Sequence, residues 1–316
     1  MRARVFVATV LLAAATQTAP RAERTPHVAA QALTNGQRHH YVIGGRVRPL
    51  LFWVGKDDVG DAVIAARRDA QSSSYALLIG SDPERAPRSI NRWGYIAEDV
   101  RGAEATIVGL MTESDEESVD QAEANLRKRG ESTFNVIHAS VTGGESRSVV
   151  RSVAAPSTLT LRQVDTVLEL ADRNGTDGQT RVVPMPAGTR PGFLSAVAEL
   201  LHAQAAEWRT TRTVHANERL PFVYHGKLYL LRATHSRVMD GERIGTTKYD
   251  HLIASQFQIK STTANSVTDF SMTFAPDGPL AEIPISVTYQ PRWWIEIQLT
   301  LDDSTTGPLP ASEVTR

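Results

Sequence analysis

Arginine and aromatic side chains gather between residues 81 and 95, in a proline-bearing loop and the strand predicted after it. A guanidinium beside an aromatic ring can receive a carboxylate, a phosphate or a sugar, because it combines charge, several donors and a flat apolar face. The candidate binding residues of this segment are Arg88, Arg92, Trp93 and Tyr95. The simpler interpretation is a surface loop whose Trp93 covers the edge of a sheet.

Two further binding candidates, Trp294 and Glu296, lie in the apolar stretch 283–301. Its odd-numbered positions are apolar and its even-numbered positions are mostly polar, which is the period of a half-buried strand. Both candidates therefore lie on the polar face. Trp294 could cover a groove, stack on a sugar, contact a partner or pack against the helical part of the chain, and packing is the commonest of these roles. Glu296 would anchor a ligand if its face lined a cavity, and otherwise it faces solvent.

Carboxylates offer the catalytic alternative. Glu98 and Asp99 follow Arg92 closely, and a hydrolase of cell-wall or other polymers needs two carboxyl groups about 5–10 Å apart in a cleft. The chain has no G-x-S-x-G, S-x-x-K, H-E-x-x-H, Walker or G-x-G-x-x-G motif. Distant residues can still assemble a catalytic site. We therefore lean towards a protein that is not an enzyme and keep the hydrolase as an alternative.

Metal and cofactor sites are not predicted. The chain has no cysteine, which excludes disulfides, cysteine-type zinc sites and thiol nucleophiles. Its nine histidines are scattered, and none lies at the i,i+4 spacing of a helical metal site. The acidic cluster of Asp57, Asp58 and Asp61 does not match an EF-hand, because Val59 and Arg68 would occupy ligand positions 3 and 12 of the loop. A solvated turn is the preferred interpretation of that cluster.

Composition and charge limit the classes of partner. The chain has 316 residues, of which 41% are hydrophobic, and its formal net charge is −1. This length suffices for one large or two ordinary domains with a buried core. The sequence contains no polybasic stripe, so neither nucleic acid nor an anionic membrane surface is an expected partner.

The first fifteen residues have the pattern of a secretory signal peptide. M-R-A-R is basic, residues 5–15 are mostly apolar, and Ala13 and Ala15 form an A-x-A cleavage site. The apolar run is too short for a membrane span, which needs about 20 residues. No cysteine follows that could carry a lipid. We expect a mature chain in the periplasm or outside the cell, without a transmembrane segment after cleavage.

Three helices are predicted in the N-terminal two thirds of the chain. Ser114–Glu117 and Thr160–Gln163 are capping boxes, in which a hydroxyl and a Glu or Gln side chain satisfy the first N–H groups of a helix. The third helix starts at T-R-P-G-F, residues 189–193, and has apolar residues at helical spacing up to Trp208. These helices would alternate with strands.

Strands account for most of the remaining pattern. A hairpin is expected from residue 41 to residue 68, with Gly55–Gly60 as its connection. After about residue 213 nearly every segment has strand character, with tight turns at His225-Gly226 and Asp240-Gly241. We expect these strands to form an antiparallel meander, which could be an open sheet, a sandwich or a barrel.

The last two strands are expected to form a hairpin around Gln290–Arg292. A three-residue turn there would pair Tyr289 with Trp293 and Val287 with Ile295. All four side chains would then lie on the odd, apolar face, which explains why the alternation continues through the turn.

The expected fold class is α+β, with a mixed N-terminal part of about three helices followed by the antiparallel meander. The predicted divisions are a signal peptide at 1–15, a flexible lead-in at 16–40, a mixed α+β domain at 41–212, an antiparallel β domain at 213–303 and a disordered tail at 304–316. The pattern leaves open whether the two halves form one domain.

The C-terminal part resembles the β-rich half of secreted bacterial envelope proteins of unknown function. The resemblance rests on Y-H-G-K-L-Y-L-L at 224–231, on the long meander, and on I-P-I-S-V-T-Y-Q-P-R-W-W-I-E-I-Q-L-T-L at 283–301. It covers under a third of the chain. It implies a β-rich fold and an envelope location, and no activity comes with it.

The leading functional hypothesis is an exported, non-catalytic envelope protein. It would bind an apolar or amphipathic small molecule, or an envelope protein partner, through its β domain, because the long sheet has a rich apolar face. The alternatives are a structural or assembly protein without a small ligand, and the secreted hydrolase with a carboxylate site. A large apolar cavity would favour the ligand, and an exposed apolar patch would favour assembly.

Overall fold

The computed structural model describes residues 37–47, 54–112, 130–216, 219–241, 243–244, 247–264, 266–292 and 295–302. Several sequence predictions fall outside these residues. They are the signal peptide at 1–15, the helix expected to begin at Ser114, the tail at 304–316, and the tryptophan pair Trp293 and Trp294. The described chain begins with strand at Gln37, inside the lead-in expected to extend to residue 40.

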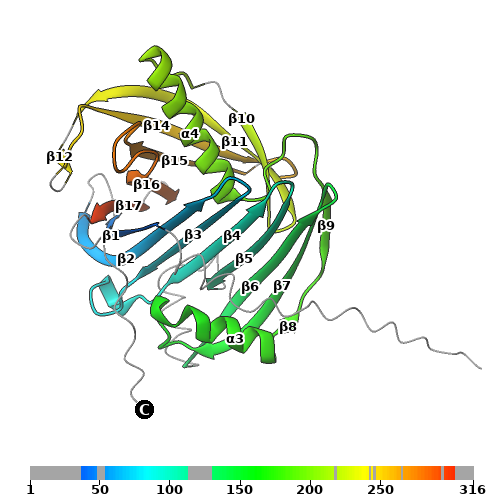
Figure 1. Cartoon of the computed structure of the whole chain (residues 1–316). Coiled ribbons are helices and arrows are strands. Elements are labelled where there is room, and N and C mark those ends of the chain that lie inside the picture. The colour runs from blue at the N-terminus through cyan, green and yellow to red at the C-terminus, as the bar shows by residue number, and fades with distance from the viewer. Residues whose placement is uncertain are drawn as a thin grey trace, which may run out of the picture.

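Fifteen strands form one antiparallel sheet (Figure 1). Its N-terminal strands are β1 (Gln37–Val47), β2 (Val54–Arg68), β3 (Ser72–Ser81), β4 (Trp93–Arg101), β5 (Glu104–Thr112), β6 (Glu131–Thr142), β7 (Glu145–Pro156), β8 (Thr176–Asp177) and β9 (Arg181–Pro184). Its C-terminal strands are β10 (Arg219–Tyr224), β11 (Lys227–Asp240), β14 (His251–Ser261), β15 (Val267–Phe274), β16 (Pro284–Arg292) and β17 (Ile295–Asp302). A separate short ribbon consists of β12 (Arg243–Ile244) and β13 (Thr247–Lys248).

Strand order follows the chain except at one place. The order is β10-β11-β14-β15-β16-β17-β1-β2-β3-β4-β5-β6-β7-β8, with β9 also on β7. The exception is the pairing of β1 with β17, which joins the two ends of the described chain and places Tyr41 opposite Leu301. Short hairpin turns join several of the other neighbours, such as β4 with β5 and β6 with β7, because each turn returns the chain to the neighbouring strand.

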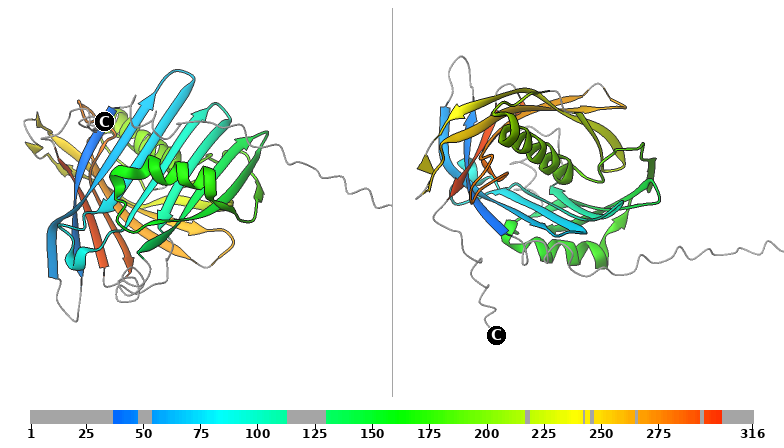
Figure 2. Two further views of the ribbon diagram at one scale, coloured as in Figure 1. Left: turned by 90° about the horizontal axis from the view of Figure 1, so that it is seen from below. Right: turned by 45° about the horizontal axis from the view of Figure 1, so that its top comes forward.

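The sheet curls around one helix and carries another on its outer face (Figure 2). The inner helix is α4 (Phe193–Thr211), and the outer helix is α3 (Val164–Asn174), which follows the short 3-10 helix η2 (Leu161–Gln163). A further 3-10 turn, η1 (Pro87–Ser89), lies between β3 and β4. None of the described helices has both the length and the apolar character to cross a membrane.

The two ends of the curled sheet lie next to each other. Arg190, just after β9, forms a parallel bridge with Phe222 of β10. The N–H of Arg190 donates to the carbonyl of Pro221, and the N–H of Val223 donates to the carbonyl of Arg190. This bridge occupies backbone groups at the outer edge of β10 that would otherwise be exposed.

Apolar side chains cover both faces of the sheet. On the inner face, Leu200 and Trp208 of α4 pack with Phe257 and Phe270 of the C-terminal strands. On the outer face, α3 packs its buried side chains against strands β3 to β7, in a cluster that includes Trp93 and Phe134. Alternating side chains of one strand therefore enter two different cores, each covered by one helix.

The sequence signals for both helices are confirmed in the structure. The Thr160–Gln163 capping box forms, and the helical segment ends at Asn174 before Gly175. In α4, Gly192 is the N-cap, and Arg212 ends the helix in the left-handed conformation with φ of 59°. The guanidinium of Arg212 lies over the Trp208 ring at 4.2 Å from its centroid, a cation–π contact that stabilises the helix end.

The expected α+β class is wrong. The described residues form one mainly β structure with the two α-helices α3 and α4. The Thr160–Gln163 capping box correctly marked a helix start, but helices are a small part of the described N-terminal half. The glycine turns at Gly102 and Gly143-Gly144, all with positive φ, return the chain directly to the sheet, so no helical crossover is needed. The division predicted near residue 212 stays a prediction.

Two predicted turns are also wrong. Gly55–Gly60 lies within β2, and Gln290–Arg292 lies within β16. Tyr289 pairs with Ile297 and Val287 pairs with Leu299, whereas the expected partners were Trp293 and Ile295. Each partner moves by four residues, which is an even number, so the odd positions still share one face. The face predicted to be apolar is the buried one, with Ile285, Leu299 and Leu301 in the core.

Candidate functional site

Trp93 and Tyr95 are brought together, but in the outer core and not in an open loop. Both belong to β4 and are less than 5% exposed. Trp93 donates its indole N–H to the carbonyl of Leu159 at 3.0 Å and packs against Phe134 at 5.1 Å between ring centroids. Burial raises the pKa of the Tyr95 hydroxyl. Trp93 therefore packs in the core on a strand that lies between β3 and β5, and not from a surface loop over the edge of the sheet.

The remaining sequence candidates do not join this pair. Arg92 donates its backbone N–H to Ser81 Oγ at 2.8 Å, and only the backbone of Arg88 is described. Glu296 lies on β17, where its carboxylate is 3.6 Å from the guanidinium of Arg46 on the neighbouring strand β1. Trp294 lies outside the described residues.

The carboxylates proposed for hydrolysis lie on opposite faces of β4. Glu98 points to the inner face, where it contacts α4, and Asp99 points outwards, where it accepts a hydrogen bond from Ser74 at 3.3 Å. Adjacent residues of a strand always separate in this way. The structure therefore does not bring Glu98 and Asp99 together as an acid and base.

Glu98 anchors the N-terminus of α4. Its Oε1 accepts the N–H of Leu194 at 2.7 Å, and its Oε2 accepts the N–H of Ser195 at 2.8 Å. A Cβ at Gly192 would lie 2.2–2.4 Å from the carboxylate atoms, so only glycine allows this approach. Burial raises the pKa of Glu98, and although the N–H bonds from Leu194 and Ser195 oppose it, burial prevails.

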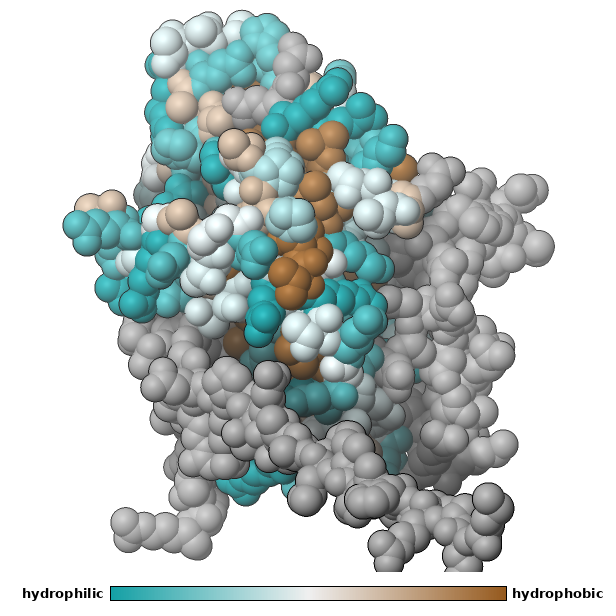
Figure 3. Space-filling view, turned by 90° about the vertical axis from the view of Figure 1, so that its right-hand side faces the viewer, coloured by the Kyte–Doolittle hydropathy of each residue, from teal (hydrophilic) through white to brown (hydrophobic). Residues whose placement is uncertain are grey.

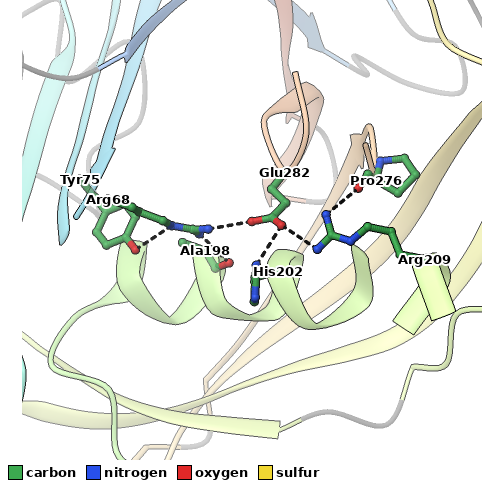
Figure 4. Close-up of polar contacts among 7 residues, drawn as sticks. All are labelled: Arg68, Tyr75, Ala198, His202, Arg209, Pro276 and Glu282. Carbon is green, nitrogen blue, oxygen red and sulfur yellow. Dashed lines mark hydrogen bonds and ion pairs between the residues drawn. The ribbon is translucent and has the colours of Figure 1, made fainter. Parts of the chain in front are cut away.

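A second polar cluster lies farther along α4 (Figure 4). Glu282, from the loop between β15 and β16, accepts hydrogen bonds from Arg68 of β2 at 2.7 Å and from Arg209 of α4 at 3.3 Å. His202 Nδ1 lies 2.9 Å from the same carboxylate. Arg68 also donates to the carbonyl of Ala198 and to the hydroxyl of Tyr75.

This cluster ties β2 and α4 to one carboxylate of the β15–β16 loop. Glu282 has a φ of 64°, a conformation that is uncommon for a residue with a Cβ. Burial raises the pKa of Glu282, but the hydrogen bonds from Arg68 and His202 outweigh it and hold the pKa below its usual range. The negative charge is thus stabilised by its neighbours, and the arrangement is that of a structural tether between β2, α4 and the β15–β16 loop.

Among the described residues, the apolar, odd-numbered face of 283–301 is packed and does not line a cavity. Ile285, Leu299 and Leu301 pack with Tyr41 and Leu280. Val287 and Tyr289 pack against the α4 cluster. The odd face of 283–301 is therefore core, and it does not support a ligand site there.

An open groove lies where the two ends of the sheet meet. It has a volume of about 450 Å³, within the range of about 300–1,000 Å³ typical of small-molecule sites. Its lining comes from β9 and the segment after it, from the β10–β11 turn, and from the residues after β14: Arg181, Val183, Pro184, Pro186, Gly226, Lys227, Leu228, Thr262 and Thr263. Figure 3 shows the side of the molecule that carries β9, where apolar side chains form a band between hydrophilic ones.

The β10–β11 turn approaches β9 very closely. Gly226 has a φ of 61°, and a Cβ there would lie 2.5 Å from Ser148 Oγ and 2.6 Å from Arg181 Cβ. The aliphatic stem of Arg181 therefore lies against the turn that carries Lys227. Two cationic side chains from opposite ends of the sheet consequently share one groove.

Two serine hydroxyls lie beneath the same region. Ser146 and Ser148 of β7 are register partners of Val183 and Arg181, so their side chains share the groove-facing side of the sheet. They are 0% and 1% exposed, and neither hydroxyl has a hydrogen-bond partner among the described residues. A buried unsatisfied polar group costs about 1–3 kcal/mol.

None of the groove residues was among the sequence candidates. The available signals were the R-V-V-P-M-P run at 181–186 and the turn in Y-H-G-K at 224–227. The turn was recognised as a hairpin signal, but its position against β9 depends on the curling of the sheet.

Comparisons with known proteins do not assign the chain to a family. No protein-family model matches the chain, and no curated protein matches it. A solved structure of a "putative lipoprotein" from Parabacteroides distasonis aligns with 85% of this chain and 94% of its own, at 6% identity and a TM-score of 0.26. Similarity at this level supports no conclusion about fold or function.

Proposed function

We propose that this chain is an exported, non-catalytic binding protein whose groove between β9 and the β10–β11 turn takes an apolar or amphipathic small molecule. The export part rests on the predicted signal peptide. The binding part rests on the groove, which replaces the odd face of 283–301 as the ligand surface because that face is packed core.

The observation that carries the proposal is the apolar wall of the groove. Val183, Pro184, Pro186 and Leu228 line it from two elements that only the curled sheet brings together. Each methylene of a ligand buried on such a wall contributes about 0.8 kcal/mol. Prolines keep the wall rigid, because their φ is restricted, and a preformed surface costs less entropy on binding.

Catalysis receives less support from the described residues. Glu98 is fully buried and engaged by the N-terminus of α4, and Asp99 is on the other face of the sheet. His202 lies 2.9 Å from the carboxylate of Glu282 and belongs to the structural tether around it. The binding hypothesis is therefore preferred over the hydrolase.

The test compares two neighbouring valines of β9. Val183 lines the groove, whereas Val182 points away from it and is 48% exposed. Binding of a neutral solvatochromic dye, and its displacement by decanol, would be titrated with the parent protein and with Val183→Glu and Val182→Glu. We expect Val183→Glu to weaken dye binding at least tenfold and Val182→Glu to leave it unchanged.

Two results would count against the proposal. Equal binding by the parent and Val183→Glu would place the ligand elsewhere. A parent protein that binds neither the dye nor decanol would support the structural or assembly role instead. Circular dichroism of each variant would show that the fold is retained.

A further inference from the structure

The groove contains two cations that have no ion-pair partner among the described residues. Arg181 and Lys227 both line it, and neither forms an ion pair with any described carboxylate. Some arginines elsewhere are paired: Arg68 pairs with Glu282, and Arg151 pairs with Asp172 and Asp177. The groove therefore combines an apolar wall with a local excess of positive charge.

The backbone geometry keeps these cations together. The stem of Arg181 lies against Gly226, whose absent side chain makes room for it, and Lys227 is the next residue in the chain. Ser148 lies close to Gly226, and Ser146 lies beside Val183 on the neighbouring strand; neither hydroxyl has a hydrogen-bond partner among the described residues. Two cationic side chains thus line the same groove as the apolar wall.

From this arrangement we infer that the ligand is a single-chain anionic amphiphile, an assignment that rests on the proposed binding function. Its carboxylate or phosphate head is held by Arg181 and Lys227, and its alkyl chain lies along Val183, Pro186 and Leu228. Charge complementarity selects the head, because a guanidinium and an ammonium both favour oxyanions. The groove volume of about 450 Å³ suits one alkyl chain rather than two.

The first experiment separates the contribution of the ligand's anionic head group to the affinity from the contribution of its alkyl chain. Calorimetric titrations with decanoate, decyl phosphate and neutral decanol would be carried out below micelle formation, at low and high salt. We expect both anions to bind at least tenfold more tightly than decanol, and we expect salt to reduce this difference because it screens charge. The ratio between decanoate and decyl phosphate shows whether the head is a carboxylate or a phosphate.

Charge-removing variants then test the assignment of the head group. Arg181→Gln combined with Lys227→Gln should abolish the advantage of the anions, so that decanoate, decyl phosphate and decanol bind this variant with affinities within about twofold of one another. The matched control combines Arg147→Gln, on the opposite face of β7 beside Val182, with Lys248→Gln on β13. This control removes the same charge and should preserve the anion preference.

The results distinguish a failure of the anionic head-group assignment from a failure of the proposed binding function. If decanol and decanoate bind equally well, and the groove double variant changes neither, the anionic head is refuted while the apolar groove stands. If the control double variant removes the preference as fully as the groove variant, general charge rather than this groove is responsible, and the assignment is also refuted. If none of the three ligands binds, the binding function itself is wrong.

Discussion

Removing the carboxylate of Glu98 should destabilise the fold more than any surface substitution. In the parent, both carboxylate oxygens accept N–H groups from the first turn of α4. Glu98→Ala leaves the N–H groups of Leu194 and Ser195 without an acceptor in a site that is fully buried. Water cannot replace the carboxylate there unless the helix end opens.

The size of the expected loss in unfolding free energy follows from the two backbone N–H donors, of Leu194 and Ser195, that lose their acceptor. Each buried unsatisfied N–H costs about 1–3 kcal/mol, so Glu98→Ala should lower the free energy of unfolding by about 2–6 kcal/mol. Total stabilities are about 5–15 kcal/mol for typical domains, so this loss is a large share. Glu98→Gln keeps one acceptor oxygen and should cost about 1–3 kcal/mol.

The pH dependence has a definite sign. Burial holds the pKa of Glu98 above its ordinary value, so the folded state favours the protonated form more than the unfolded state does. The stabilisation is complete below the unfolded pKa of about 4.3 and is lost as pH rises through the folded pKa. The difference between the parent and Glu98→Gln should therefore be larger at pH 5 than at pH 8.

Urea unfolding followed by tryptophan fluorescence measures these differences, with Glu104→Ala and Glu104→Gln at an exposed position of β5 as controls. The controls should stay within about 0.5 kcal/mol of the parent. A Glu98→Ala protein equally close to the parent would refute the anchoring role of this carboxylate. A destabilisation that grows from pH 5 to pH 8 would refute the direction of its pKa.

Three further predictions concern the tether, the groove and the outer core. Glu282→Gln should lower the free energy of unfolding by about 1 kcal/mol after allowance for solvent screening. Because the pKa of Glu282 is lowered, this stabilisation is present above the unfolded pKa and lost as pH falls through the folded pKa; denaturant midpoints of parent and variant that keep their separation at pH 3 would contradict it. Gly226→Ala should cost about 1–2 kcal/mol because of its left-handed φ and its contact with Ser148, and it should weaken dye binding in the groove; unchanged binding would show that the turn does not shape the site. Trp93→Ala should cost about 3–5 kcal/mol as a buried large-to-small substitution, measured as a shift in the thermal midpoint, and a shift no larger than that of an exposed residue would show that Trp93 is not part of the core.

Local features could be predicted where the sequence pattern and the interaction that it indicates both involve residues close together in the chain. The capping box at Thr160–Gln163 and the hairpin turn at His225-Gly226 depend on residues within a few positions of each other, and both occur as expected. The alternation of 283–301 also identified the correct buried face, because a strand has a fixed period of two. The turn of that segment was misplaced, since an even change of register leaves the same pattern.

The candidate site was less accessible from the sequence. Trp93 and Tyr95 have types common in binding sites, but β4 is covered by helices on both faces, so these aromatic side chains are buried in the outer core. The groove residues gave no comparable signal. Arg181 and Lys227 are separated in the sequence by the rest of β9, by α4 and by β10. Only the meeting of β9 with the β10–β11 turn brings them together.

The sequence by itself determined some local conformations of this protein: the hairpin turn at His225-Gly226, the helix start at the Thr160–Gln163 capping box, and the apolar side of the strands in 283–301. It also determined the absence of disulfide chemistry, since the chain has no cysteine. Only the tertiary structure decided that β1 pairs with β17, that α4 occupies the inside of the curled sheet, and that the two ends of the sheet form a groove. The physical reason is that local propensities act over a few residues, whereas the curl of the sheet is set by the summed packing of both of its faces against the two helices.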